Sequence, residues 1–167
     1  MTQLYAQPYD LSATGYYFKT AEEYTAKADA LRNDYGEPVE EFEIQFIDGD
    51  DIDCELAKAV GLDQANFAQF LTGVKEWEDW EKQTVIIALG ECGYDFEPNL
   101  IPIQFDVEIH DVSTMRELAE QFVEEGMFGE VPEAFQNYID YDAIARDLAV
   151  DFSEITIAGM NYVYACR

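Results

Sequence analysis

Basic residues are scarce in this sequence. Nine lysines and arginines stand against 36 aspartates and glutamates in 167 residues, which gives a formal net charge of −27. Direct binding to nucleic acid or to an anionic membrane surface needs clustered Lys and Arg. Nine scattered basic residues form no such cluster, so we expect neither nucleic acid nor membrane as a partner.

Long apolar runs are also absent. No run approaches the roughly 18 residues that indicate a membrane-spanning helix. The first ten residues, MTQLYAQPYD, lack the basic and then apolar pattern of a signal peptide. We therefore expect a cytoplasmic protein.

Few residues carry the usual chemistry of catalysis or metal binding. Cys54, Cys92 and Cys166 are far apart and form no CxxC pair, and His110 is the only histidine. A zinc site needs suitably spaced ligands, and a reactive cysteine needs a lowered pKa, which acidic neighbours oppose. We expect three reduced thiols, no metal and no cofactor.

The acidic segment IDGDDIDCE, residues 47–55, does not fit an EF-hand calcium loop. Counting from Asp48 places Ile52 and Asp53 at the fifth and sixth positions, where the loop needs an oxygen ligand and a glycine. Glycine-rich phosphate-binding motifs are missing. Among so many acids, no carboxylate pair stands out as that of a glycosidase. We expect no catalytic residues and no enzyme.

The sequence does have the composition of a folded core. Apolar residues make up 49% of the chain and aromatic residues 14%, which is ample for packing. In EEFEIQF, Phe42, Ile44 and Phe46 alternate with polar residues, the period of a half-buried strand. Every part of the chain is acidic, with net charges of −10, −6 and −11 over residues 1–60, 61–103 and 104–167. The charges are therefore held on folded elements.

Periodicity predicts an α+β fold of three small modules. The first, residues 1–52, is β-rich with one helix. Strand patterns in LYAQPY and GYYFKT precede that helix. The helix starts at Thr20, with Glu23 completing a capping box, and is expected to end near Gly36.

The second module, residues 53–102, is predicted to be helical. Three helical patterns end at Gly61, Gly73 and Gly90. The third pattern, KEWEDWEKQTVIIAL, places Trp77 and Trp80 on one face. A loop with two prolines follows.

The third module, residues 103–167, is predicted to be mixed. IQFDVEIHDV alternates as a strand. The helix TMRELAEQFVEEG has Thr114 and Glu117 as a capping box, and a second helix follows Asp140 as its N-cap. The tail EITIAGMNYVYAC predicts a hairpin that turns near Gly159.

Charge itself is the main functional signal. A folded protein this acidic can be adapted to high salt, can bind a basic partner or can imitate a polyanion. Two copies of the chain together carry −54, the phosphate charge of roughly 27 base pairs. An arginine can bind a carboxylate in two-point fashion, much as it binds phosphate.

Two stretches carry acids without any Lys or Arg. One lies between Arg32 and Lys58, and the other between Lys82 and Arg116. We expect their carboxylates to stand in for phosphates, with no single one indispensable. These are Glu37, Glu40, Glu41, Glu43, Asp48, Asp50, Asp51, Asp53 and Glu55 in the first, and Glu91, Asp95, Glu97, Asp106, Glu108 and Asp111 in the second.

The segment from Arg116 to Leu148, RELAEQFVEEGMFGEVPEAFQNYIDYDAIARDL, resembles the C-terminal region of ArdA-type antirestriction proteins. A looser resemblance covers EEFEIQFIDGDD. The motif residues are Gly129, Glu130, Pro132, Tyr138, Ile139, Asp140, Tyr141, Arg146, Asp147 and Leu148.

The resemblance implies a specific function. ArdA-type proteins are inhibitors of type I restriction–modification enzymes and are carried by plasmids, transposons or prophages. They are elongated, three-domain dimers that imitate bent B-form DNA, with dimer contacts in the C-terminal domain. By this resemblance, the chain would occupy the DNA-binding channel formed by the specificity and methyltransferase subunits, and its motif would shape the fold and the homodimer.

The chemistry of the motif residues allows an interpretation of its own. Tyr138 and Tyr141 are of a type common at interfaces. Arg146 is expected to make a structural ion pair, with Asp142 as one candidate partner. Two other functions stay open at this point: an acidic module that binds some other basic, nucleic-acid-binding protein, and a small halophilic enzyme.

Overall fold

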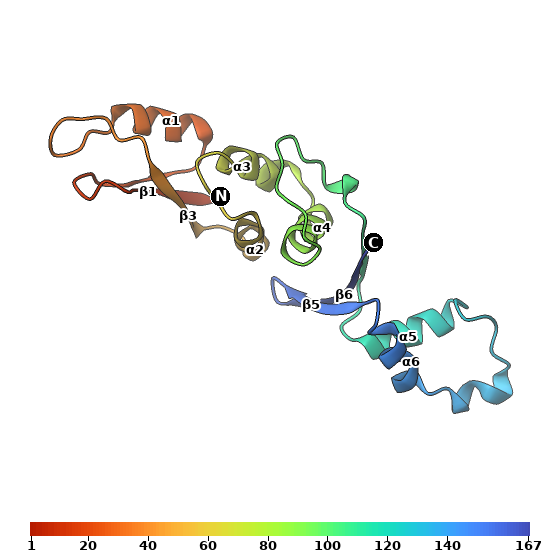
Figure 1. The fold of residues 1–167 in the computed structure, drawn as a ribbon. Helices are drawn as coiled ribbons and strands as arrows, with labels where there is room; N and C mark the ends of the chain where they lie inside the picture. Colours follow the sequence, from red (N-terminus) through yellow and green to blue (C-terminus); the bar gives the residue numbers. More distant parts are fainter. The chain divides into compact units, whose positions relative to one another are not determined.

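The structure, a computed structural model, describes all 167 residues and groups them into two compact units, Met1–Phe105 and Asp106–Arg167. Helices and two small antiparallel sheets make up both units (Figure 1), so the predicted α+β class is confirmed. The finer division at residues 52 and 102 stays a prediction. None of the helices has the length and apolar character needed to cross a bilayer.

The first unit begins with a three-stranded antiparallel sheet in the order β2-β1-β3. Its strands are β1 (Gln3–Pro8), β2 (Tyr16–Phe18) and β3 (Phe42–Asp48). Strand β3 has the predicted alternation, since Phe42 and Ile44 are buried while Glu41, just before the strand, and Glu43 are exposed. One face of β3 therefore packs into the core and the other carries carboxylates.

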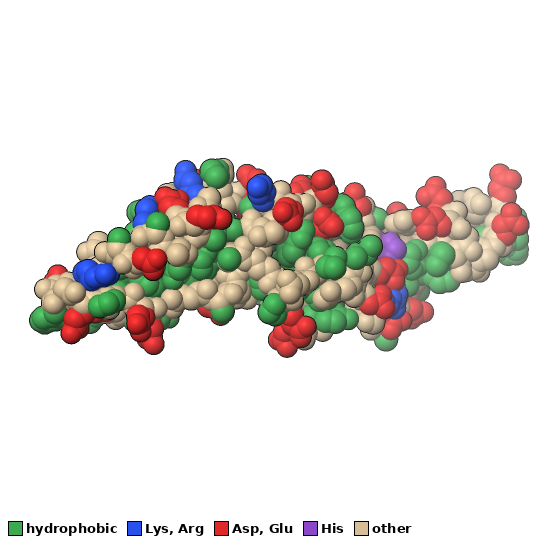
Figure 2. All heavy atoms as spheres, turned by 90° about the horizontal axis from the view of Figure 1, so that it is seen from above, with side chains coloured by type: hydrophobic (Ala, Val, Ile, Leu, Met, Phe, Trp, Pro, Cys, Tyr) green, Lys and Arg blue, Asp and Glu red, His purple; other side chains and the backbone are tan.

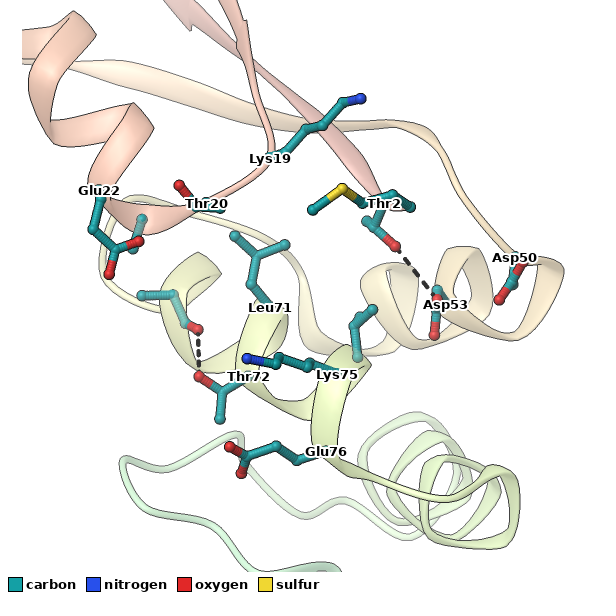
Figure 3. Close-up of a pocket in the computed structure, with 14 residues that line it drawn as sticks. Thr2, Lys19, Thr20, Glu22, Asp50, Asp53, Leu71, Thr72, Lys75 and Glu76 are labelled. Atoms are coloured by element: carbon teal, nitrogen blue, oxygen red, sulfur yellow. Dashed lines mark hydrogen bonds between the residues drawn. The ribbon is translucent and has the colours of Figure 1, made fainter.

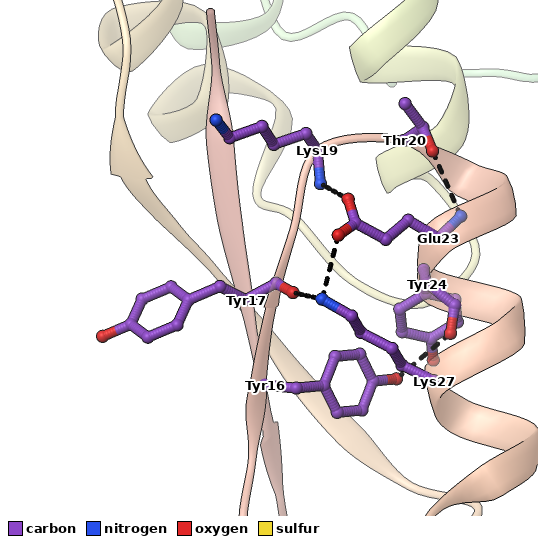
Figure 4. A network of polar contacts seen from close by, with 7 residues as sticks. All are labelled: Tyr16, Tyr17, Lys19, Thr20, Glu23, Tyr24 and Lys27. Carbon is purple, nitrogen blue, oxygen red and sulfur yellow. Dashed lines mark hydrogen bonds and ion pairs between the residues drawn. The ribbon is translucent and has the colours of Figure 1, made fainter.

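Helix α1 (Ala21–Ala30) begins as predicted. Oγ1 of Thr20 accepts a hydrogen bond from the backbone N–H of Glu23, whose carboxylate accepts one from the backbone N–H of Lys19 (Figure 4). Nζ of Lys27 lies 2.9 Å from the other oxygen of that carboxylate. The hydrogen bond from Lys27, followed by that from Lys19, lowers the pKa of Glu23. This carboxylate is therefore already engaged within its own unit.

The end of α1 differs from the prediction. The helix stops at Ala30, well before Gly36. The side-chain oxygen of Asn33 accepts hydrogen bonds from the backbone N–H groups of Tyr35 and Glu37. Asn side chains compete with helical hydrogen bonding in this way, so the segment turns back instead of extending the helix.

The helical part of the first unit contains α2 (Asp51–Val60), α3 (Phe67–Glu76), α4 (Asp79–Gly90) and the short η1 (Pro102–Gln104). Helix α2 ends at Gly61 as predicted, with a left-handed φ of 66°. Helix α3 passes through Gly73, so the predicted stop there is wrong. A Cβ at Gly73 would lie 2.8 Å from the ring of Trp77. This glycine therefore gives room to an aromatic ring and does not end the helix.

Trp77 also breaks the predicted continuity of the third helical pattern. Its backbone is extended, with φ −84° and ψ 137°, and it separates α3 from α4. The carboxylate of Glu81 accepts a hydrogen bond from the backbone N–H of Glu78 at 2.9 Å, which fixes the start of α4. Trp80 lies in the first turn of α4 whereas Trp77 lies outside both helices, so the prediction of one shared helical face is wrong.

An ion pair lies in the core of the first unit. Nζ of Lys82 in α4 is 2.8 Å from Oδ1 of Asp53 in α2. Oγ1 of Thr2 lies 3.4 Å from the second carboxylate oxygen. The two residues of the pair are only 6% and 3% exposed. The pair therefore joins α2, α4 and the segment before β1.

The second unit packs two helices with a sheet in the order β4-β6-β5. Its elements are β4 (Val107–His110), α5 (Met115–Glu124), η2 (Glu133–Tyr138), α6 (Tyr141–Leu148), β5 (Ser153–Ile157) and β6 (Met160–Cys166). The core contains Leu118, Phe122, Phe152, Val163 and Ala165.

Local signals of the second unit are confirmed. Oγ1 of Thr114 accepts from the N–H of Glu117, and Oδ1 of Asp140 accepts from the N–H of Ala143. The hairpin between β5 and β6 turns at Ala158 and Gly159, which have φ of 50° and 80°. Both turn residues have positive φ, as in the tight turns that suit the twist of a hairpin.

The thiol prediction holds for one cysteine. Cys54 in α2 is a free thiol and is half-buried. Cys92 and Cys166 are not free thiols, so the prediction is wrong for these two.

The buried pair yields a test of stability. Replacing Asp53 by Ala leaves the Lys82 ammonium buried without a partner, and we expect a loss of about 3–5 kcal/mol in the free energy of unfolding, measured by urea denaturation. Asp53→Leu combined with Lys82→Met should recover most of that loss, because both charges are removed. Lys58→Ala, an exposed change in α2, should stay within about 0.5 kcal/mol. A loss below about 1 kcal/mol for Asp53→Ala would contradict this account.

Candidate functional site

On the face that Figure 2 shows, acidic side chains are dispersed, with few Lys and Arg among them. Seven carboxylates of the first acid stretch are exposed and form no ion pair. We call them the N-terminal carboxylate surface; they are Glu37, Glu40, Glu41, Glu43, Asp48, Asp50 and Asp51. They follow the chain from the loop before β3, along that strand and through the turn into α2.

Two other predicted members of this stretch lie elsewhere. Asp53 is buried against Lys82, so the expectation that it displays its carboxylate to a partner is wrong. It lies three and four residues before Leu56 and Ala57, on the buried face of α2. Glu55 is half-buried, with a carboxylate oxygen 3.9 Å from Nζ of Lys58.

The second acid stretch is divided between the two units. Glu91, Asp95 and Glu97 follow α4 and are exposed in the first unit. Asp106 and Asp111 flank β4 in the second unit and are exposed.

Glu108 differs from its neighbours because both of its oxygens are engaged. Nε2 of His110 lies 2.7 Å from Oε1, and Nε of Arg167 donates to Oε2 at 2.9 Å. Partial burial raises the pKa of Glu108, but the hydrogen bonds from Arg167 and then His110 outweigh it, so the net pKa is below the ordinary value. The Arg167 guanidinium also lies over the ring of Phe152, 5.2 Å from its centroid. Glu108 therefore ties the end of β6 to β4.

The motif residues are spread over a turn, a short helix and α6. Gly129 has a φ of 91°, Asp140 caps α6, and Ile139 and Leu148 are half-buried. Glu130, Pro132, Tyr138 and Asp147 are exposed, and Tyr141 is half-buried.

Arg146 is exposed and forms no ion pair, so the predicted pair with Asp142 is wrong. Asp142 instead accepts a 2.6 Å hydrogen bond from Arg116, which also pairs with Glu120 and lies over the ring of Tyr141. Arg116 joins α5 to α6 and pairs with Asp142, the carboxylate that sequence spacing assigned to Arg146.

The segment between α5 and α6 exposes large apolar side chains. We call residues 127–138 the apolar segment; its exposed members are Met127, Phe128, Phe135 and Tyr138. A hollow of about 600 Å³ nearby is lined by Val123, Val131, Ile139 and Tyr141, among others. Of these four residues, the sequence analysis identified only Tyr138 as a possible interface residue. The sequence signal for the other three is a group of apolar residues without helical period between Gly126 and Asn137.

A second hollow, of about 510 Å³, lies in the first unit (Figure 3). Lys19, Thr20, Thr72 and Lys75 are among its lining residues, and Asp53 lies at its edge with a hydrogen bond to Thr2. No His or Cys lines it. No group of three or more His, Cys, Asp or Glu residues in the chain is arranged to hold a metal ion.

Comparison with known proteins identifies a family. The chain matches the family model described as antirestriction protein (ArdA) over residues 8–162. This match confirms the resemblance of the C-terminal motif and extends it over nearly the whole chain. No curated protein matches the chain.

The contacts of Glu108 with His110 and Arg167 predict how the stability of the second unit depends on pH. The folded-state pKa of Glu108 is below the ordinary 4.5, so its contribution to stability is complete above that pH and is lost as the pH falls through the folded-state pKa. We expect Glu108→Gln to destabilise the second unit at pH 7 by about 0.2–1 kcal/mol. The loss should shrink towards pH 3. Amide hydrogen exchange of β6 measures this loss of stability, with Asp111→Asn as an exposed control. Equal losses at pH 7 and near pH 3 would contradict a stabilising role of the ionised Glu108 carboxylate.

Proposed function

The chain belongs to the ArdA family of antirestriction proteins, and from this we propose that it inhibits type I restriction–modification enzymes by imitating DNA. The N-terminal carboxylate surface is the observation that carries the proposal. Its seven carboxylates are exposed and have no cation beside them, so they can accept hydrogen bonds from a partner's arginines and lysines. The partner surface is the basic channel of the specificity and methyltransferase subunits.

The spacing of the carboxylates determines how closely the protein can match the charge density of DNA. Glu41 and Glu43 lie two residues apart along an extended chain, which separates them by about 6.7 Å. One strand of B-DNA carries a phosphate for every 3.4 Å or so of helix axis. A single protein strand therefore offers about half that charge density. Acids from the end of β3, the following turn and α2, namely Asp48, Asp50 and Asp51, are needed to approach the charge of a duplex.

Occupation of the channel explains inhibition without any chemical step. The carboxylates would pair with the enzyme's basic residues in place of DNA phosphates, and DNA could no longer enter. The protein would then act as a non-catalytic cytoplasmic inhibitor, in the compartment where its target enzyme meets incoming DNA. An acidic module for some other basic protein is the second candidate, and it predicts no competition with DNA for the purified enzyme.

The apolar segment supports the further proposal of a homodimer. Exposed aromatic and methionine side chains in one segment are of the types enriched at protein interfaces. Tyr138 of the antirestriction motif is 83% exposed. Two chains joined there would double the charge available to one target.

A graded neutralisation experiment tests the mimicry. Changing Glu41 to Gln alone should alter the inhibition constant little, because each exposed ion pair with the enzyme is screened and weak. Amide substitutions should be combined at Glu40, Glu41, Glu43, Asp48, Asp50 and Asp51. That set should weaken inhibition strongly and make inhibition depend less steeply on salt concentration, because fewer ion pairs form with the enzyme.

A matched control compares three neutralised acids of the N-terminal carboxylate surface with three neutralised acids outside it. The triple variant Glu40→Gln, Glu41→Gln and Glu43→Gln is compared with Glu22→Gln, Asp29→Asn and Glu76→Gln, three exposed acids of the same unit. Only the first triple should weaken inhibition markedly. Equal effects would show that net charge alone matters, and a complete loss from Glu41→Gln would argue for a single hot spot.

The dimer is tested at the apolar segment. Phe135→Ser combined with Tyr138→Ser should leave the fold intact, because both side chains are exposed, and should weaken self-association at least about tenfold. Sedimentation velocity at micromolar concentrations measures the change. Val150→Ser, an exposed apolar change in the same unit, is the control. A wild-type protein that sediments only as a monomer would contradict the proposal.

A further inference from the structure

Two loops of the first unit are bound to each other. They are residues 9–15, between β1 and β2, and residues 31–38, after α1. Nδ2 of Asn33 donates to Oδ2 of Asp10 at 2.9 Å, and the backbone N–H of Asp34 donates to the carbonyl oxygen of Ser12 at 3.1 Å. Both loops extend from the same end of the sheet, at the far left of Figure 1. We call them together the tip.

Asp10 is the centre of this connection. Its second oxygen accepts hydrogen bonds from both the backbone N–H and the hydroxyl of Ser12. The hydrogen bond from Asn33, followed by those from Ser12, lowers the pKa of Asp10. The carboxylate is thus ionised at neutral pH, and the tip is held in one arrangement.

Large apolar side chains project from the tip. Leu11 is 99% exposed, Tyr35 83% and Tyr9 64%. A single exposed apolar residue is ordinary on a protein surface. Here three lie on two loops that are hydrogen-bonded together, and exposed apolar groups close to one another mark interaction sites.

The charge around the tip indicates what kind of partner fits it. Asp34, Glu37 and Glu40 are exposed there. Arg32 is the only basic residue in either loop, and its guanidinium donates to the carbonyl oxygens of Asp29 and Leu31. The tip is also continuous along the chain with the N-terminal carboxylate surface. A complementary partner therefore has an apolar depression bordered by basic residues.

We propose that the tip is an apolar anchor, with Leu11 and Tyr35 inserted into an apolar depression beside the basic channel of the target enzyme. The proposal rests on the proposed function. It adds a contact that DNA itself cannot make, because the outside of a duplex presents phosphates and sugars. Charge gives fast association and broad affinity for basic surfaces, whereas a few buried apolar and aromatic anchors carry much of the affinity for one partner.

The hydrogen bonds within the tip favour such a contact. A loop that is ordered before binding loses less conformational entropy when its side chains are immobilised. Asp10 and Asn33 fix the two loops relative to each other, so the loops that carry Leu11 and Tyr35 are held together before binding.

The test is a double variant, Leu11→Ser with Tyr35→Ser, measured for binding to and inhibition of a purified type I enzyme at two salt concentrations. We expect binding about tenfold weaker than wild type at both concentrations, because an apolar contact is not screened by salt. The salt slope should stay that of the wild type. Binding to polylysine, which needs charge alone, should not change.

Controls separate folding from binding. Ile103→Ser removes an exposed apolar side chain from the same unit outside the tip and should bind as wild type does. Circular dichroism melting checks that the double variant is folded. Leu11→Ala alone, at a side chain that is almost fully exposed, should still show part of the loss.

Each outcome distinguishes an apolar contact made by the tip from electrostatic binding by the carboxylates. If the wild type inhibits and the tip variants inhibit equally well, the anchor is overturned and the proposed function stands. A loss that disappears at high salt, or equally weakened polylysine binding, also overturns the anchor, because the effect would then be electrostatic. A wild-type protein that does not bind the enzyme overturns the proposed function, and the anchor with it.

Discussion

The chain has 36 acidic side chains and must keep nearly all of them in contact with water while it buries a core, and this constraint governs the structure. Burying an ionised carboxylate without a partner is costly. Strand β3 meets this constraint by keeping one side in solvent, with buried Phe42 and exposed Glu43. Aromatic rings supply much of the packing behind the sheet, for example where Tyr24 and Phe18 meet Phe67 at 4.5 and 5.3 Å between ring centroids.

The few basic residues serve mainly inside the units. Lys27 connects α1 to the backbone of β2, Arg116 connects α5 to α6, and Arg167 connects β6 to β4. Lys82 does the same in the core. Because these cations are bound to internal partners, the outer carboxylates of β3 and the turn after it stay uncompensated. The same small number of basic residues thus stabilises the fold and leaves the acidic surface open to a partner.

Local signals in the sequence predicted local structure well. The caps at Thr20, Thr114 and Asp140 depend on residues three positions away, so spacing alone reveals them. Predictions failed where the partner is distant or unrelated to spacing. Gly73 looks like a stop until the ring of Trp77 is seen over it, and Asp53 looks like a surface acid until Lys82, 29 residues on, is found beside it.

Much of the candidate site was predictable, because alternation along β3 already assigns Glu43 to the wet face. The choice between paired and free carboxylates was not. It depends on which cation reaches which acid across elements, as when Arg116 takes Asp142 and leaves Arg146 without a partner. Exposed apolar residues of the first unit were missed for a related reason, since the sequence gives no sign of whether Leu11 is covered in the fold.

The Asp53–Lys82 pair also constrains how this sequence can change over generations. Replacing either residue alone leaves a charge stranded in the core, whereas replacing both at once removes the problem. Most single-step routes away from the pair therefore pass through a poorly folded intermediate. Lineages that keep this fold should retain the two residues together or lose them together, while the acids of the wet face, each replaceable by itself, are free to drift.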